Sequence, residues 1–312
     1  MSAPLRIGVV GAGRVGAVLA AALRAAGHEI TAVAGESDAS RERAATLLPG
    51  VPVAKPTDVA RGCDVLLLTV PDDMLANVVT TLSDAGAIGS GHLVVHTSGR
   101  HGLTVLAPAA ARGARTVALH PAMTFTGTAV DLPRLAGCVF GVTAAPDERP
   151  VAEALVADLG GTTMWVAEER RALYHAGLAH GANHLVTLVS EAMEILGAAT
   201  GQDEMAAATL RPLLTAALDN ALGHGDAALT GPIVRGDANT VRDHLAEISR
   251  TAPHTLPSYV ALARATLDRV VLDGRVLPIR AARIRALLDE AVDAAAAGRA
   301  VAPDRADERS GR

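Results

Sequence analysis

The chain has 312 residues, half of them hydrophobic, and a formal net charge of −5 with acidic and basic residues interspersed. This length predicts two domains, and the lack of a patch of one charge argues against nucleic acid or a membrane surface as a partner. Cys63 and Cys138 lie far apart in apolar runs, which is typical of reduced core thiols. Because we find no signal region and no apolar run of about 18 residues, we expect a soluble, cytoplasmic protein.

Short β-branched runs alternate with helix-length segments through the first 166 residues. The runs predict strands at 5–10, 29–35, 64–70, 92–97, 115–119, 138–143 and 162–166. Strands that alternate with helices favour an α/β fold, with a doubly wound, mostly parallel sheet covered by helices on both faces.

The pattern changes after Glu168, where only helical periodicity remains. Helices are predicted near 168–199, 203–223, 237–249, 257–272 and 278–297. We therefore expect one sheet domain over 1–166 and an all-helical domain over 167–297. The charged end, 298–312, has few large apolar residues and is predicted to be a disordered tail.

The motif GAGRVG (11–16) directly follows the first predicted strand and opens a helix. Gly11 permits a tight turn, Gly13 lets the backbone approach a pyrophosphate, and Gly16 lets the helix pack closely on the strand. With Arg14 and Val15 they form the predicted phosphate-binding turn, because a helix N-terminus offers N–H groups to phosphates. The sheet domain is thus predicted to be a Rossmann dinucleotide-binding domain, with a structural glycine turn as the alternative.

The choice between NAD and NADP depends on the segment after the second strand. Glu36 stands about 20 residues after the motif, where an acid would hold a ribose 2′-hydroxyl. Groups suited to a 2′-phosphate follow it: Ser37, Ser40, Arg41 and Arg43. We favour NADP and keep NAD open. Alternatively, Ser37 or Asp38 only caps a surface helix.

Polar residues also follow the next predicted strands, whose carboxyl ends should face the cofactor. Val70 and Pro71 are predicted cofactor contacts. The two acids that follow them either touch the cofactor or cap the next helix, and capping is expected for Asp73. Ser98 follows the fourth strand. His120 and Thr124 follow the fifth strand and are predicted to lie near the substrate.

Five segments together resemble a bacterial family described as Rossmann-like with a C-terminal domain of unknown function: GAGRVG, HTSGRHG, LHPAMTFTG, YHAGLAHGANH and LTGPIVRGD. That family is related to pyrroline-5-carboxylate reductases and β-hydroxyacid dehydrogenases, and it includes ketopantoate reductases of pantothenate biosynthesis. The resemblance implies an NADP-dependent reductase that converts ketopantoate to pantoate. LHPAMTFTG is also similar to a segment of prephenate dehydrogenases, in which a histidine lies by the substrate.

The segment YHAGLAHGANH carries three histidines. On an α-helix His180 and His184 lie about 40° apart, whereas His175 points away and is expected to pack against the sheet domain. Three interpretations remain open for the stripe of His180, Asn183 and His184: a zinc site, a structural role, and a general acid that orients the substrate. We favour the last and expect no metal. β-Hydroxyacid dehydrogenases have a catalytic lysine with this spacing, K-x-x-N-N, where this chain has His180.

The segment LTGPIVRGD offers groups for an acidic substrate. Arg235 has a planar guanidinium that suits a carboxylate, and Thr230 is a further predicted substrate contact. Asp237 either orients Arg235 or caps the following helix.

These features predict an NADPH-dependent reductase of a small 2-oxo acid. Ser98 and His120 would lie near the nicotinamide, and His120 or His180 would supply the proton. A reductase of cyclic imines of the pyrroline-5-carboxylate type is the enzymatic alternative, and a non-catalytic NADP(H)-binding regulator is the other. The apolar helices over 257–297 are expected to form a homodimer interface.

Overall fold

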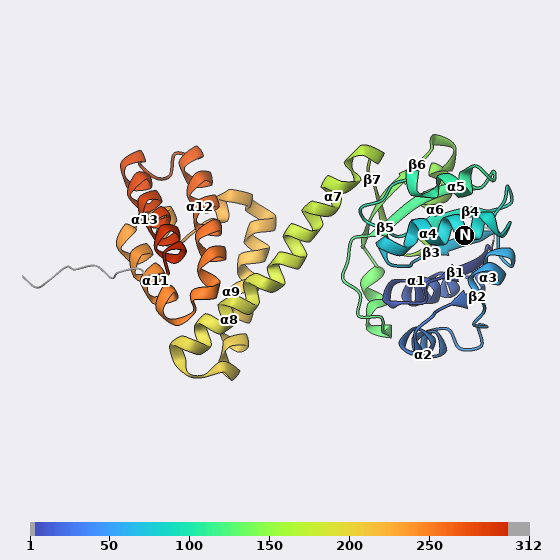
Figure 1. Ribbon diagram of the computed structural model, residues 1–312, viewed down its shortest axis with the longest axis horizontal. Coiled ribbons are helices and arrows are strands. Elements are labelled where there is room, and N and C mark those ends of the chain that lie inside the picture. The colour runs from blue at the N-terminus through green and yellow to red at the C-terminus, as the bar shows by residue number, and fades with distance from the viewer. Residues whose placement is uncertain (1–3, 299–312) are drawn as a thin grey trace, which may run out of the picture. The chain divides into compact units, whose positions relative to one another are not determined.

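The computed structural model describes residues 4–298 and contains two compact units that divide after Gly181. We call residues 4–181 the sheet unit and residues 182–298 the helical unit (Figure 1). This division falls later than the predicted boundary at residue 166, because the first helix after the sheet belongs with the sheet unit by its contacts. Apart from Gly298, the predicted tail lies outside the described residues.

A seven-stranded sheet with the order β2-β1-β3-β4-β5-β6-β7 forms the sheet unit. The seven predicted strands are all confirmed as β1 (Arg6–Val10), β2 (Glu29–Ala34), β3 (Val65–Leu68), β4 (Leu93–His96), β5 (Arg115–Pro121), β6 (Val139–Ala144) and β7 (Thr162–Trp165). Neighbouring strands pair parallel, except that β5 and β6 pair antiparallel. The predicted fold class is therefore confirmed.

Helices cover both faces of this sheet. They are α1 (Arg14–Ala25), α2 (Asp38–Leu47), α3 (Pro56–Arg61), α4 (Asp72–Asp84), α5 (Ala107–Ala110) and α6 (Arg149–Asp158), and α7 (Arg171–Leu178) follows the last strand. Successive residues of a strand point to opposite faces, so Leu67 packs in the core with α1 and α6, whereas Leu66 and Leu68 pack in the core with α3, α4 and α5. The loops after the parallel strands consequently meet at one edge of the sheet, where such folds bind ligands.

The helical unit contains α8 (His184–Thr200), α9 (Asp203–His224), α10 (Pro232–Arg235), α11 (Ala238–Thr251), α12 (Leu256–Leu272) and α13 (Pro278–Ala296). Its core is built from buried aliphatic residues of α11, α12 and α13, such as Leu245, Leu267 and Leu288. The predicted helices after residue 200 are all present. Within residues 4–298, no helix is long and apolar enough to cross a membrane.

The predicted helix over 168–199 is not one regular α-helix. A 3₁₀ turn at Glu168–Arg170 leads into α7, and a π-helical segment at Ala179–Asn183 separates α7 from α8. Because a π turn holds more residues than an α turn, the α-helical angle of about 40° between His180 and His184 does not apply here. Single π turns of this kind are frequent at functional sites.

Candidate functional site

The segment after β1 makes a tight turn that leads directly into α1. Gly11 has a φ of 104°, and a β carbon there would lie 2.7 Å from the Thr69 carbonyl carbon. A β carbon on Gly16 would lie 2.3 Å from both the Gly11 carbonyl oxygen and the Thr69 hydroxyl oxygen. Only glycine fits at these two positions. Gly13 is the N-cap of α1 and has no side-chain capping bond, so the first N–H groups of α1 can serve a ligand.

A cavity of about 720 Å³ opens beside this turn, at the carboxyl ends of β1 to β4. Most of the predicted cofactor residues line it together with Ser98: Gly11, Gly13, Arg14, Val15, Glu36, Ser37, Ser40, Val70 and Pro71. The lining also includes residues that the sequence did not single out, among them Pro56, Thr69, Met74 and Val78. Of the predicted cofactor residues, Gly16, Arg41 and Arg43 are not in the lining.

Glu36, Ser37 and Ser40 lie side by side in the wall of the cavity at the end of β2. The Ser37 hydroxyl accepts a hydrogen bond from the Ser40 N–H at 3.2 Å, so Ser37 caps α2 while it also lines the cavity. Arg41 donates to the Glu36 carbonyl at 2.6 Å and pairs with Asp38. Its guanidinium therefore holds the start of α2, which explains its place outside the lining.

The predicted cap of α4 is wrong. Pro71 occupies the N-cap position, and no side chain caps this helix. Asp72 and Asp73 instead fall in its first turn, where a negative charge interacts favourably with the helix dipole. Asp72 also lines the cavity.

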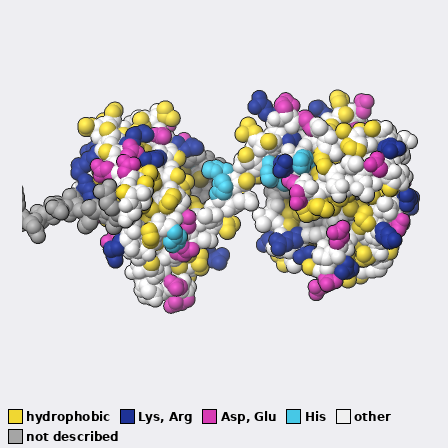
Figure 2. All heavy atoms as spheres, viewed as in Figure 1, with side chains coloured by type: hydrophobic (Ala, Val, Ile, Leu, Met, Phe, Trp, Pro, Cys, Tyr) yellow, Lys and Arg dark blue, Asp and Glu magenta, His cyan; other side chains and the backbone are white. Residues whose placement is uncertain are grey.

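Histidine side chains and a tyrosine gather at the carboxyl ends of β4 and β5 in the sheet unit. Histidines are cyan in Figure 2. His120 Nδ1 lies 2.9 Å from the Tyr174 hydroxyl, and the ring of His175 meets that of His120 edge to face at 6.3 Å. A β carbon on Gly99, next to Ser98, would lie 2.6 Å from the His175 ring. The prediction that His175 packs against the sheet is thus confirmed, whereas Tyr174 was missed because a single tyrosine in a helix forms no pattern.

Burial keeps His96 and His120 neutral. Loss of hydration lowers the pKa of His120 to about 4, and the nearby positive charge of Arg171 lowers it further in the same direction. Loss of hydration also lowers the pKa of His96 to about 4, against a hydrogen bond with the Gly102 carbonyl at 2.8 Å. A histidine that donates a proton is expected to have a pKa near neutral. The surroundings of His120 instead lower its pKa to about 4.

We predict that the free energy of unfolding falls between pH 6.5 and pH 4 because of His96 and His120. The unfolded chain protonates both side chains below about pH 6.5, whereas the native state stays neutral until about pH 4, so acid favours unfolding. Each histidine should remove about 2 kcal/mol between pH 7 and pH 5. Urea unfolding at both pH values measures this loss, and an equal loss in the His96→Asn, His120→Asn double variant would contradict it.

Arg171 and Glu168 hold the loop that follows β4. The Arg171 guanidinium is buried and donates to the carbonyl oxygens of Ser98, His101 and Gly141, at 3.0, 2.8 and 2.9 Å. The Glu168 carboxylate accepts hydrogen bonds from the N–H groups of residues 103 and 104. Burial opposes ionisation of Glu168, but these hydrogen bonds outweigh it and lower the pKa. Ser98 is thus fixed by charged groups that lie outside the cavity lining.

The loop after β5 is organised by Asp131. This carboxylate is fully buried and accepts hydrogen bonds from the N–H groups of Thr126 and Gly127, at 2.8 and 2.7 Å. Gly127 packs closely on Arg14, since a β carbon there would lie 2.9 Å from the Arg14 Cγ. Thr124, a predicted substrate contact, is exposed and does not line the cavity.

The predicted stripe of His180, Asn183 and His184 falls at the boundary of the two units. His180 and Asn183 lie in the π-helical segment, and His184 begins α8. All three side chains are exposed. No group of three or more His, Cys, Asp or Glu residues within 4–298 is placed to hold a metal ion, so the zinc interpretation finds no third ligand there.

The predicted substrate residues of the helical unit take separate places. Thr230 lines a cavity of that unit, whereas Arg235 is exposed at the end of α10. Asp237 accepts hydrogen bonds from the Thr240 N–H at 3.1 Å and the Thr240 hydroxyl at 2.7 Å. It therefore caps α11, and the capping alternative is confirmed.

Solved structures with this fold include several reductases. A Bacteroides fragilis protein proposed to be an NADP oxidoreductase is 20% identical, with a TM-score of 0.72 over 85% of this chain and 98% of that one. An imine reductase from Myxococcus stipitatus in complex with NADP⁺ is 17% identical, with a TM-score of 0.61 over 96% of each chain. A pyrroline carboxylate reductase from Plasmodium falciparum with NADP bound is 11% identical, with a TM-score of 0.55 over 91% of this chain and 98% of that one.

Comparison with family models separates the chain into two matched regions. A search of curated proteins gave no match. Residues 1–121 match the model of a Rossmann-like domain, and residues 138–266 match that of a domain of unknown function, DUF2520. The chain therefore combines a Rossmann-like domain with a DUF2520 domain.

Proposed function

We propose that this protein is an NADP-dependent reductase of a small carbonyl or imine compound. The observation that carries the proposal is the turn at Gly11 and Gly16, which leaves no room for a side chain beside a cavity of about 720 Å³. The backbone of Gly11 to Val15 and the N-terminus of α1 would hold the pyrophosphate. Arg14, Ser37 and Ser40 would serve the 2′-phosphate, and Glu36 a ribose hydroxyl. NADPH would supply a hydride to the substrate.

The residues near Ser98 would control the proton. His120 is neutral near pH 7, since its pKa is lowered to about 4, and burial raises the pKa of Tyr174. The neutral His120 ring retains one N–H and the Tyr174 phenol retains its O–H, so one of the two is used in their hydrogen bond of 2.9 Å and the other is left for the substrate. We propose that Tyr174 and His120 act as a pair that donates a hydrogen bond to the substrate oxygen or nitrogen, in place of a charged histidine.

Replacing either member of this pair should lower turnover without loss of cofactor binding. We expect Tyr174→Phe and His120→Ala each to reduce kcat by 10² to 10⁴-fold, the usual range for a general acid. The double variant should be little worse than either single variant, because the two residues act as a unit. Steady-state kinetics and NADPH titration measure both effects. His92→Asn is the control, since within residues 4–298 the His92 ring bonds to the backbone of Gly89 and Ala60 alone.

Ketopantoate is the first substrate that we propose, on the resemblance of the five motifs to a family that includes ketopantoate reductases. A cyclic imine is the second, since solved structures of this fold include imine and pyrroline carboxylate reductases. Oxidation of NADPH, with NADH in parallel, against ketopantoate and pyrroline-5-carboxylate at neutral pH distinguishes the two. Cofactor binding with no turnover of either compound would favour a non-catalytic NADP(H)-binding regulator.

We also propose that the helical unit forms a homodimer. Large apolar side chains are exposed on its helices, including Leu213 and Leu222 on α9 and Leu272 and Ile279 at the ends of α12 and α13. Protein interfaces form where such exposed apolar side chains are contiguous. Static light scattering should give twice the chain mass of 31.7 kDa at micromolar concentration. A single chain mass there would contradict the dimer.

A further inference from the structure

A second cavity lies wholly within the helical unit. It has a volume of about 410 Å³ and is walled by α8, α10, α11, α12 and the segment before α10. This volume falls in the range of small-molecule sites, which are mostly apolar with a few placed polar groups. The apolar part of the wall comes from Leu188, Ile195, Leu229, Pro232, Ile233, Leu262 and Ala263.

The charge of this wall comes from one carboxylate. Of the described residues that line the cavity, Glu191 carries the acidic side chain, and none is a lysine or an arginine. The Ser258 hydroxyl donates a hydrogen bond to Glu191 Oε2 at 2.5 Å, which fixes the carboxylate. Oε1 takes no part in that bond, and a carboxylate oxygen can accept more than one hydrogen bond. An anion would be repelled here, whereas a cation would be stabilised.

An aromatic group lies in the same wall. His244 Nδ1 is 2.8 Å from the Tyr259 hydroxyl, and the two rings meet edge to face at 6.1 Å. Burial raises the pKa of Tyr259, so the phenol stays neutral. A neutral aromatic ring together with a carboxylate is the combination that attracts organic cations.

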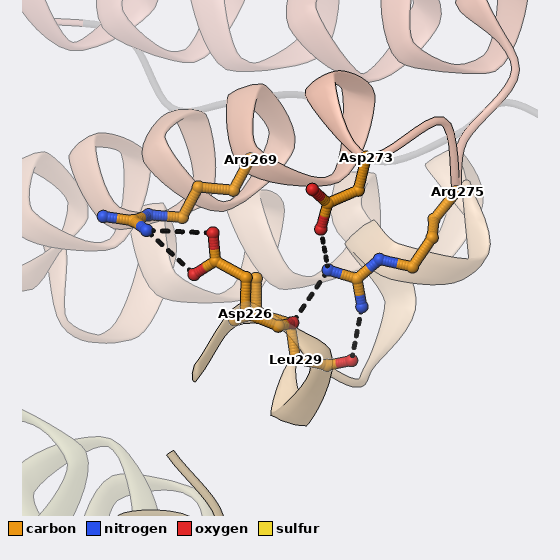
Figure 3. Close-up of polar contacts among 5 residues, drawn as sticks. All are labelled: Asp226, Leu229, Arg269, Asp273 and Arg275. Atoms are coloured by element: carbon orange, nitrogen blue, oxygen red, sulfur yellow. Dashed lines mark hydrogen bonds and ion pairs between the residues drawn. The ribbon is translucent and has the colours of Figure 1, made fainter. Parts of the chain in front are cut away.

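The segment that carries Leu229 and Thr230 is held in place from outside (Figure 3). Arg269 donates to both carboxylate oxygens of Asp226, at 2.8 and 3.1 Å. Arg275 donates to the carbonyl oxygens of Asp226 and Leu229 and to the Asp273 carboxylate. These two arginines are thus engaged by the segment before α10 and do not line the cavity.

We propose that this cavity binds a small organic amine in its protonated form, with the ammonium group on Glu191 and an apolar body against Leu188, Ile195 and Tyr259. The inference goes beyond the reductase function, because it concerns the helical unit alone and needs no cofactor. Thr230 and Arg235 were both predicted to contact one acidic substrate. In this proposal Thr230 belongs to the amine cavity, which Arg235 does not line.

Calorimetric titration of the full chain with three compounds of similar shape tests the charge preference: benzylamine, benzyl alcohol and benzoate. We expect benzylamine to bind about 10 to 100-fold more tightly than benzyl alcohol, as a charge-assisted hydrogen bond would give. Benzoate should bind more weakly than both. Equal affinities, tighter binding of benzoate, or no binding of benzylamine at millimolar concentration would overturn the proposal.

Variants on α8 test the position of the ammonium group. Glu191→Gln should abolish the preference for benzylamine, whereas Glu194→Gln should keep it, because Glu194 is exposed, pairs with His254 and does not line the cavity. Circular dichroism verifies that both variants fold. A Glu191→Gln variant with unchanged preference would overturn the proposal. NADPH titration in the same samples distinguishes this outcome from a failure of the reductase proposal.

Discussion

We expect the Gly16→Val variant to bind NADPH at least about 100-fold more weakly than the parent protein. A β carbon at this position would overlap the Gly11 carbonyl oxygen, which is backbone and cannot rotate away, so α1 must shift away from β1. The N–H groups at the start of α1 would then leave the phosphate position, and hydrogen bonds to charged groups are worth about 1.5 to 3 kcal/mol each. Fluorescence titration with NADPH measures the loss.

Gly89→Val is the matched control, because a β carbon on Gly89 meets nothing within 4 Å and its φ is not in the left-handed region. It should bind NADPH as the parent protein does.

A shift of α1 also lowers stability, so Arg14→Ala provides a milder variant whose fold should be unaffected. Compared with the parent protein, it should lose more affinity for NADPH than for NADH. Unchanged NADPH affinity in Gly16→Val would remove this cavity as the dinucleotide site.

The strands and the phosphate turn could be predicted because each depends on local sequence. β3 and β4 are buried along their whole length, so they appear as continuous apolar runs. The spacing of Gly11 and Gly16 is itself a local signal for this turn, although both glycines also meet Thr69 at the end of β3, a contact that the motif does not contain. The caps at Ser37 and Asp237 also involve partners only three residues away.

The contacts around Ser98 could not be predicted, because they join residues far apart in the chain. Arg171 donates to a carbonyl 73 residues earlier, and His120 meets a hydroxyl 54 residues later. An arginine at the start of a helix is usually solvated, so nothing local predicts that Arg171 is buried. The π-helical segment was missed for a related reason, since periodicity alone does not reveal one extra residue in a turn.

Arg171→Met is expected to lower the free energy of unfolding by about 3 to 5 kcal/mol. The guanidinium satisfies three carbonyl oxygens, of Ser98, His101 and Gly141, and methionine would leave them without this donor in a buried place. Arg171→Lys should recover only part of the loss, because a single ammonium cannot match the planar guanidinium. Urea unfolding measures these differences, and Arg112→Met is the control, since Arg112 is exposed and pairs with Asp84 at 3.6 Å.

A second result follows from the charge of Arg171, which lowers the pKa of His120. Its removal in Arg171→Met should raise that pKa toward the ordinary value for histidine, and it should rise less in Arg171→Lys, where the positive charge is kept. Histidine proton resonances followed against pH by NMR measure the shift, provided that His120 is assigned through its loss in His120→Ala. An unchanged His120 titration in a folded Arg171→Met protein would mean that Arg171 only supports the loop after β4. A raised pKa would show that the guanidinium which fixes Ser98 also adds to the effect of burial on His120, so that one side chain contributes both to the geometry of the loop after β4 and to the neutral state of this histidine.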